Sequence, residues 1–171
     1  MKLWFYFAIG VVFLSLKLWY YAAETQSLFF MLKPLDLAIY LTCGAQSVYS
    51  QESGFYYDEL SILIDKSCSG FNFLLICFLL FSYLAKLHCI NTWQKIIAIP
   101  CALLIAYLVT IFTNFSRIMI ILKIEASMIE THLETLFGKR THEAEGVFVY
   151  LFFLIALYLA LDFCFKKVKK N

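Results

Sequence analysis

Residues 96–113, IIAIPCALLIAYLVTIFT, decide the class of this chain because they hold no charged residue. A membrane-spanning helix needs about 20 mainly apolar residues, with a range of about 17 to 25. The chain of 171 residues follows the same trend, with 63% hydrophobic residues, 15% charged residues and a mean hydropathy of +0.80. Soluble domains have about 50% apolar and about 25% charged residues. The sequence therefore predicts an all-α integral membrane protein.

Five apolar stretches give an expected count of about five transmembrane helices. The first, fourth and fifth are long enough to span, and the third needs its flanks. The second is interrupted by Lys33, Pro34 and Asp36, and the spacing of Lys33 and Asp36 lets the two charges meet on one helix face. The first stretch has no clean cleavage site, so we interpret it as a retained anchor. The stretches are residues 3–23, 28–43, 70–85, 96–113 and 147–165.

Lysine placement predicts the orientation in the membrane. The loop KLHCINTWQK at residues 86–95 and the tail KKVKKN at residues 166–171 are basic and hold no acid, so both are expected in the cytoplasm. Residues 44–69 and 114–146 then face outward. Counting back through five spans puts the N-terminus outside, and a second stretch that only dips into the membrane would reverse this.

The two outward segments have different patterns. A turn signal at Ser53-Gly54 and the alternating apolar positions Leu60, Ile62 and Ile64 predict a short hairpin-like outer loop. Residues 124–137 place apolar side chains at helical spacing between acidic ones, which is typical of an amphipathic helix lying in the interface. No repeat or flexible linker separates these parts, and residues 1–171 are expected to form a single membrane domain.

Three polar clusters fall at the outward ends of three predicted spans. SCSG, residues 67–70, opens the third; NFSRI, residues 114–118, closes the fourth; and HEAEG, residues 142–146, opens the fifth. The topology thus carries the thiol of Cys68, the guanidinium of Arg117 and the imidazole of His142 to one membrane surface. A charge near hydrocarbon is costly, which argues that Arg117 has a function.

These groups suit nucleophilic acyl transfer. A thiol attacks as the thiolate, which a nearby imidazolium, guanidinium or helix N-terminus favours. His142 could exchange a proton with the thiol and the leaving amine, and Arg117 could donate hydrogen bonds to the developing oxyanion. Gly70 would let a substrate backbone approach closely, and Asn114, three residues before Arg117, could orient it or bind substrate.

Other functions remain open at this point. Each residue alone has an ordinary structural interpretation, with Cys68 as a small packing residue, Arg117 as an interfacial anchor and His142 as a helix-start residue. The main alternative is a non-catalytic membrane scaffold or transporter subunit with structural charges. The six cysteines form no C-x-x-C pair, and HEAEG lacks the second histidine of a zinc protease motif. We therefore expect no metal and no cofactor, and the net charge of +2 is too small to suggest a nucleic acid partner.

The motifs Cys68-Ser69-Gly70, Asn114-x-x-Arg117 and His142-x-x-x-Gly146, in this order, resemble the exosortase/archaeosortase family of membrane cysteine transpeptidases. The resemblance covers about residues 28–165, which makes residues 1–27 an N-terminal anchor and residues 166–171 a cytoplasmic tail. It implies Cys68 as the nucleophile, Arg117 and His142 as its partners, and Asn114, Ser69, Gly70 and Gly146 as supporting or substrate-binding positions.

The same resemblance implies a location in the prokaryotic cytoplasmic membrane, a substrate class and an acceptor. Substrates would be secreted, membrane-anchored proteins with a C-terminal sorting segment made of a short motif, a transmembrane helix and a basic tail. The cleaved protein would pass to a surface lipid or polysaccharide acceptor. This chain is shorter than the many-span members and has Phe71-Asn72 where they often have leucine and arginine, which places it in a short branch near exosortase K.

Overall fold

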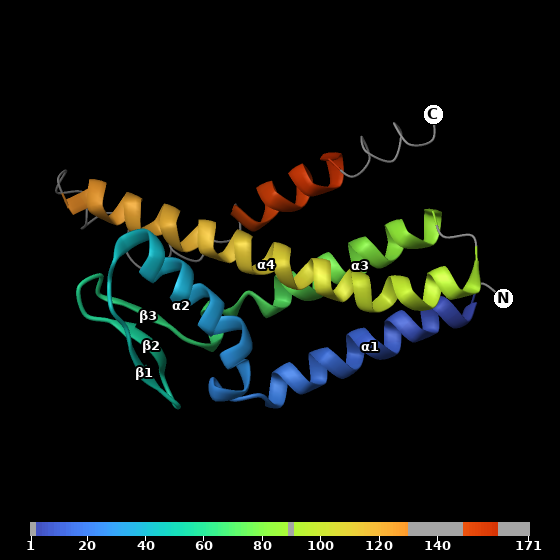
Figure 1. Cartoon of the computed structure of the whole chain (residues 1–171), viewed down its shortest axis with the longest axis horizontal. Coiled ribbons are helices and arrows are strands. Elements are labelled where there is room, and N and C mark those ends of the chain that lie inside the picture. Colours follow the sequence, from blue (N-terminus) through green and yellow to red (C-terminus); the bar gives the residue numbers. More distant parts are fainter. Residues whose placement is uncertain (1–2, 89–90, 130–148, 161–171) are drawn as a thin grey trace. The chain divides into compact units, whose positions relative to one another are not determined.

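A computed structural model of the chain describes residues 3–88, 91–129 and 149–160 (Figure 1). The chain divides into two compact units, Met1–Phe115 and Ser116–Asn171. Within the described residues, three helices are long and apolar enough to cross a membrane: α1 (Leu3–Ala22), α3 (Phe71–His88) and α4 (Thr92–Ile129). At about 1.5 Å per residue the 38 residues of α4 extend about 57 Å, so α4 must continue beyond a hydrocarbon layer of about 30 Å.

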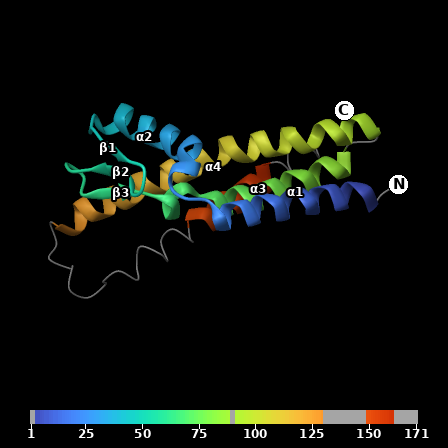
Figure 2. The same cartoon turned by 90° about the horizontal axis from the view of Figure 1, so that it is seen from below.

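Helices α1 and α3 lie side by side in opposite directions, as Figures 1 and 2 both show. Near one end, the Lys86 ammonium lies 4.2 Å from the centre of the Tyr6 ring. Near the other, Lys17 Nζ donates a hydrogen bond of 2.7 Å to Asn72 Oδ1. If both helices cross the membrane, the N-terminal end of α1 therefore shares a side with the C-terminal end of α3.

Helix α2 (Phe29–Cys43), which follows the short 3-10 turn η1 (Gln26–Leu28), is the second apolar stretch of the sequence. Its 15 residues extend only about 22 Å, and it is not among the helices that qualify as spans. It ends at Gly44, whose φ of +71° is in the left-handed region that favours glycine. The antiparallel α1 and α3 fit the alternative in which α2 does not cross. The five-span count is thus not confirmed.

The segment between α2 and α3 forms a three-stranded antiparallel sheet in the order β1 (Val48–Ser50), β2 (Gly54–Tyr57), β3 (Ile62–Ile64). The sequence predicted a hairpin here, and the structure has one strand more. Gly54 starts β2 with φ at +96°, and a side chain there would collide with the carbonyl oxygen of Ile64. Glycine is therefore required both for the turn and for the close approach of β3.

In the second unit, α4 continues without a break to Ile129, so the first residues of the predicted interfacial helix extend the fourth apolar stretch. Residues 130–137, the rest of that prediction, lie outside the described residues. Of the last apolar stretch, Val149–Ala160 is a helix.

Candidate active site

Cys68 lies in the 3-10 turn η2 (Lys66–Ser69), which joins β3 to α3. Asp65 caps this turn, because its Oδ1 accepts hydrogen bonds from Ser67 N at 2.9 Å, Ser67 Oγ at 2.6 Å and Cys68 N at 3.3 Å. A short acceptor side chain is well suited to satisfying the first free N–H groups of a helical turn. On the other side, Asn114 Nδ2 donates to the Cys68 carbonyl oxygen. The backbone of Cys68 is thus held through both its N–H and its C=O.

The Cys68 side chain is partly exposed, and its Sγ lies 3.8 Å from Leu63 O and 3.8 Å from Ser67 Oγ. The residues that follow turn the chain into α3. The buried Ser69 hydroxyl accepts from Phe71 N at 3.3 Å, and Gly70 has a left-handed φ of +71°. The order Cys-Ser-Gly therefore gives an accessible thiol, a buried cap and a turn residue at the start of a membrane-spanning helix.

Helix α1 supports this turn. Lys66 Nζ donates to Ala23 O at 2.6 Å and to Tyr21 O at 3.4 Å, so the ammonium neutralises the partial negative charge at the carboxyl end of α1. The same ammonium lies 5.0 Å from the centre of the Tyr20 ring, and that ring stacks on Phe71 with centres 4.6 Å apart. The N-terminal helix is therefore bonded to residues on both sides of Cys68.

Of the residues predicted for the site, the structure brings together Cys68, Ser69, Gly70 and Asn114. Asn114 is fully buried on α4, which also carries Arg117 three residues later. In the second unit, Arg117 Nη1 donates to the Tyr150 hydroxyl at 3.1 Å, and its guanidinium lies 5.2 Å from the centre of the Tyr150 ring. The buried Nε of Arg117 has no hydrogen-bond partner among the described residues. His142 and Gly146 lie outside the described residues.

Sequence reasoning missed Asp65 and Lys66 as supports of the Cys68 turn. Asp65 had a recognisable signal, because an aspartate two residues before a serine is typical of a capped turn. Lys66 had no such signal, since its partners are carbonyl oxygens at the end of α1, more than 40 residues earlier in the chain.

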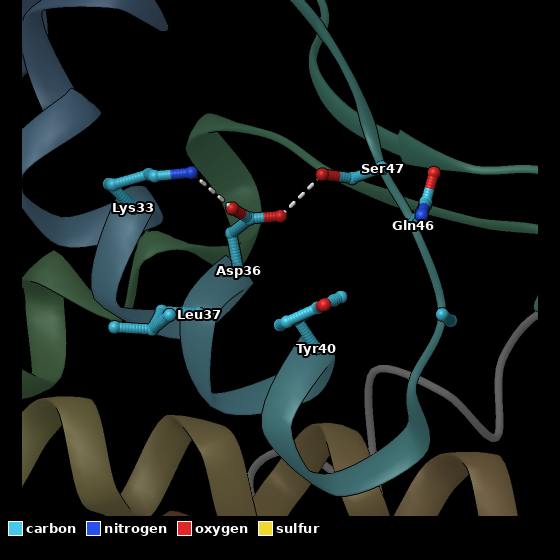
Figure 3. A pocket seen from close by; sticks show the side chains of 7 residues that line it. Lys33, Asp36, Leu37, Tyr40, Gln46 and Ser47 are labelled. Atoms are coloured by element: carbon cyan, nitrogen blue, oxygen red, sulfur yellow. Dashed lines mark hydrogen bonds and ion pairs between the residues drawn. The ribbon is translucent and has the colours of Figure 1, made fainter.

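A second polar group lies where α2 meets the sheet, beside a cavity of about 260 Å³ (Figure 3). Asp36 is 6% exposed and forms the predicted ion pair with Lys33, at 2.6 Å. It also accepts from Ser47 Oγ and, at 2.7 Å, from the Tyr57 hydroxyl. Burial alone would raise the pKa of Asp36, but the hydrogen bonds from Lys33, Ser47 and Tyr57 outweigh it and hold that pKa below its usual value.

The effect on Tyr57 has the opposite sign. Burial and the neighbouring Asp36 carboxylate raise the pKa of the Tyr57 phenol above its usual value, because both disfavour a phenolate. The pair is therefore held as a carboxylate and a neutral phenol. Asp36, on α2, and Tyr57, on β2, thus fasten that helix to the central strand of the sheet that leads into Cys68.

Comparison with known proteins agrees with the sequence motifs. The family model described as Transmembrane exosortase (Exosortase_EpsH) matches residues 1–159. No curated protein and no solved structure matches the chain. The match covers most of the chain and confirms the resemblance drawn from the three motifs. The chain is an integral membrane protein that belongs to the transmembrane exosortase family.

Proposed function

We propose that the protein is a membrane cysteine transpeptidase with Cys68 as its nucleophile. One observation carries the proposal: the Cys68 thiol is accessible while its backbone is fixed by Asp65 and Asn114 at the start of α3. Cys77, further along α3, shows the contrast, because it is fully buried among apolar side chains. A thiol as buried as that of Cys77 could not meet a substrate, which a nucleophile must do.

In the proposed reaction, the Cys68 thiolate attacks a peptide carbonyl just outside the transmembrane helix of the substrate. The sulfur–carbon bond forms, and Arg117 donates hydrogen bonds to the resulting oxyanion. The carbon–nitrogen bond then breaks as His142 gives a proton to the leaving amine, and a thioester remains on Cys68. A nucleophile on a surface lipid or polysaccharide attacks the thioester and regenerates the thiol. The partly unsatisfied Arg117 guanidinium supports its role as a donor.

The proposed substrates are secreted proteins with a C-terminal sorting segment, processed at the outward face of the cytoplasmic membrane. A groove of about 490 Å³ supports this class, since apolar side chains of α1 to α4 line it together with Tyr107. Phe71, three residues after Cys68, is part of its wall. A substrate helix in this groove would arrive from the bilayer at a fixed depth and orientation, which lowers the entropic cost of reaching Cys68.

The test uses a co-expressed membrane protein from the same genome that ends in one apolar helix and a basic tail. Cys68→Ala is expected to reduce release of that tail to less than about one-thousandth of the normal rate while the enzyme still inserts. Cys43→Ala is the matched control, because Cys43 is an exposed free cysteine at the end of α2. Tail release at the normal rate by Cys68→Ala would overturn the proposal.

The rival function, a non-catalytic scaffold or transporter subunit, predicts that Cys68 can be replaced freely. A membrane-impermeant maleimide applied to intact cells separates the two. An outward nucleophile should be alkylated faster than Cys43, and alkylation should stop tail release. A scaffold would show neither effect.

A further inference from the structure

The last strand of the sheet has one edge that no described residue pairs with. β3 is the final strand in the order β1-β2-β3, and its partner is β2. In an antiparallel pair, successive residues point their N–H and C=O groups to opposite edges. The carbonyl of Ile64 faces β2, because it lies where a Gly54 side chain would be. The N–H and C=O of Leu63 must therefore face the free edge.

The position of Cys68 agrees with this assignment. Its Sγ lies 3.8 Å from Leu63 O, so the thiol sits directly beside the free edge. The Leu63 side chain is also 43% exposed. A backbone N–H and C=O that no other strand pairs with, on an exposed edge strand, form a template that an extended peptide can join.

We propose that the free edge of β3 docks the substrate main chain, in an extended conformation, next to the bond that Cys68 attacks; this rests on the proposed function. A substrate residue opposite Leu63 in antiparallel pairing gives its N–H to Leu63 O and accepts from Leu63 N. Because residues in a strand are about 3.4 Å apart, a neighbouring substrate carbonyl then comes within reach of Sγ.

This arrangement has two chemical consequences. The substrate N–H takes the acceptor that the thiol uses in the free enzyme, and a 3.8 Å contact from sulfur is weak enough to be displaced. Recognition through the main chain also depends little on which side chains the substrate has. The exposed Leu63 side chain adds an apolar contact on one face of the added strand.

Amide-to-ester replacement tests the proposal. Substituting Leu63 by its α-hydroxy analogue through nonsense suppression removes the edge N–H and keeps the side chain. The same replacement at Tyr49 is the matched control, because Tyr49 pairs with Phe55 and alternation points its N–H to the opposite edge of the sheet. Each ester also makes the carbonyl of the preceding residue a weaker hydrogen-bond acceptor. In both cases that carbonyl faces β2, so the two esters cost the sheet the same stability.

The Leu63 ester is expected to lower kcat/KM for tail release by at least about fivefold, the effect of one lost hydrogen bond. The Tyr49 ester should stay within about twofold of the unmodified enzyme. Cys68 should react with maleimide at the normal rate in both, since the free-edge N–H does not hold the thiol. Equal rates of tail release for the two esters would overturn the docking proposal while leaving the proposed function intact. Normal release by Cys68→Ala would instead overturn the proposed function.

Discussion

Tyr57→Phe should lower the free energy of unfolding by about 1.5 kcal/mol. The Tyr57 ring is fully buried and phenylalanine has nearly the same shape, so the packing remains. The loss is the 2.7 Å hydrogen bond to Asp36 Oδ1. A hydrogen bond to a charged group contributes about 1.5 to 3 kcal/mol, and the lower value applies because Lys33 and Ser47 still bond Asp36.

Asp36→Ala should cost more, about 2 to 4 kcal/mol. The buried Tyr57 hydroxyl then loses an acceptor, at a cost of about 1 to 3 kcal/mol, and the partly buried Ser47 hydroxyl loses one at a smaller cost. Tyr57 keeps a weaker partner in the backbone carbonyl of residue 36, at 3.2 Å. The Lys33 side chain is 52% exposed, so its ammonium returns to water at little cost. The double variant should be less destabilised than the sum of the two by about 1 to 2 kcal/mol.

The two groups also predict how stability depends on pH. The folded pKa of Asp36 lies below its unfolded value of about 3.9, so its contribution is present above about pH 4 and is lost as pH falls through the folded pKa. The folded pKa of Tyr57 is raised, so its contribution is present below about pH 10 and is lost as pH rises further. Asp36→Asn should remove the acid loss and Tyr57→Phe the alkaline one.

The assay is equilibrium unfolding in dodecylmaltoside micelles titrated with SDS, followed by tryptophan fluorescence and far-UV circular dichroism. Tyr56→Phe serves as the control, because Tyr56 is exposed on the same strand, and should change stability by less than about 0.5 kcal/mol. Additivity of Asp36→Ala and Tyr57→Phe to within about 0.3 kcal/mol would refute the reasoning, since it would mean that the two side chains do not interact.

Two further substitutions address the candidate site. Asn114→Leu keeps the branched shape of the side chain but removes the donor to the Cys68 carbonyl, so tail release should fall at least about tenfold at unchanged insertion; an unchanged rate would show that this bond does not position Cys68. Arg117→Lys should lower kcat at least about tenfold, because an ammonium cannot reproduce a planar two-point donor, and a rate within twofold of normal would remove Arg117 from the mechanism.

The sequence predicted the membrane class and the candidate nucleophile because both depend on local signals. Uncharged runs such as residues 96–113 identify a span without knowledge of any partner, and a glycine after Cys68-Ser69 marks a turn. Whether α2 crosses the membrane could not be predicted in this way. Besides Lys33, the partners of its buried Asp36 are Ser47 and Tyr57, which donate to it from the following loop and strand. Contacts with residues later in the chain therefore determine where α2 lies, which the apolar pattern alone does not predict.

The role of α1 shows the same limit most clearly. A lysine near the end of an anchor helix, such as Lys17, usually reaches toward water. In the structure it bonds Asn72, while Tyr20 stacks on Phe71. Phe71 and Asn72 are the two positions where this chain departs from the leucine and arginine that the resemblance leads one to expect.

Both departures therefore face the same helix, and Lys66 adds a third link from the Cys68 turn to the end of α1. Phe71 and Asn72 look like deviations from the family pattern when only the Cys68 motif is considered. Their contacts with α1 explain both residues. The family match begins at residue 1 and so includes this helix. In this protein the N-terminal helix supports the turn that carries Cys68, because removing it would take away the partners of Lys66, Phe71 and Asn72 together.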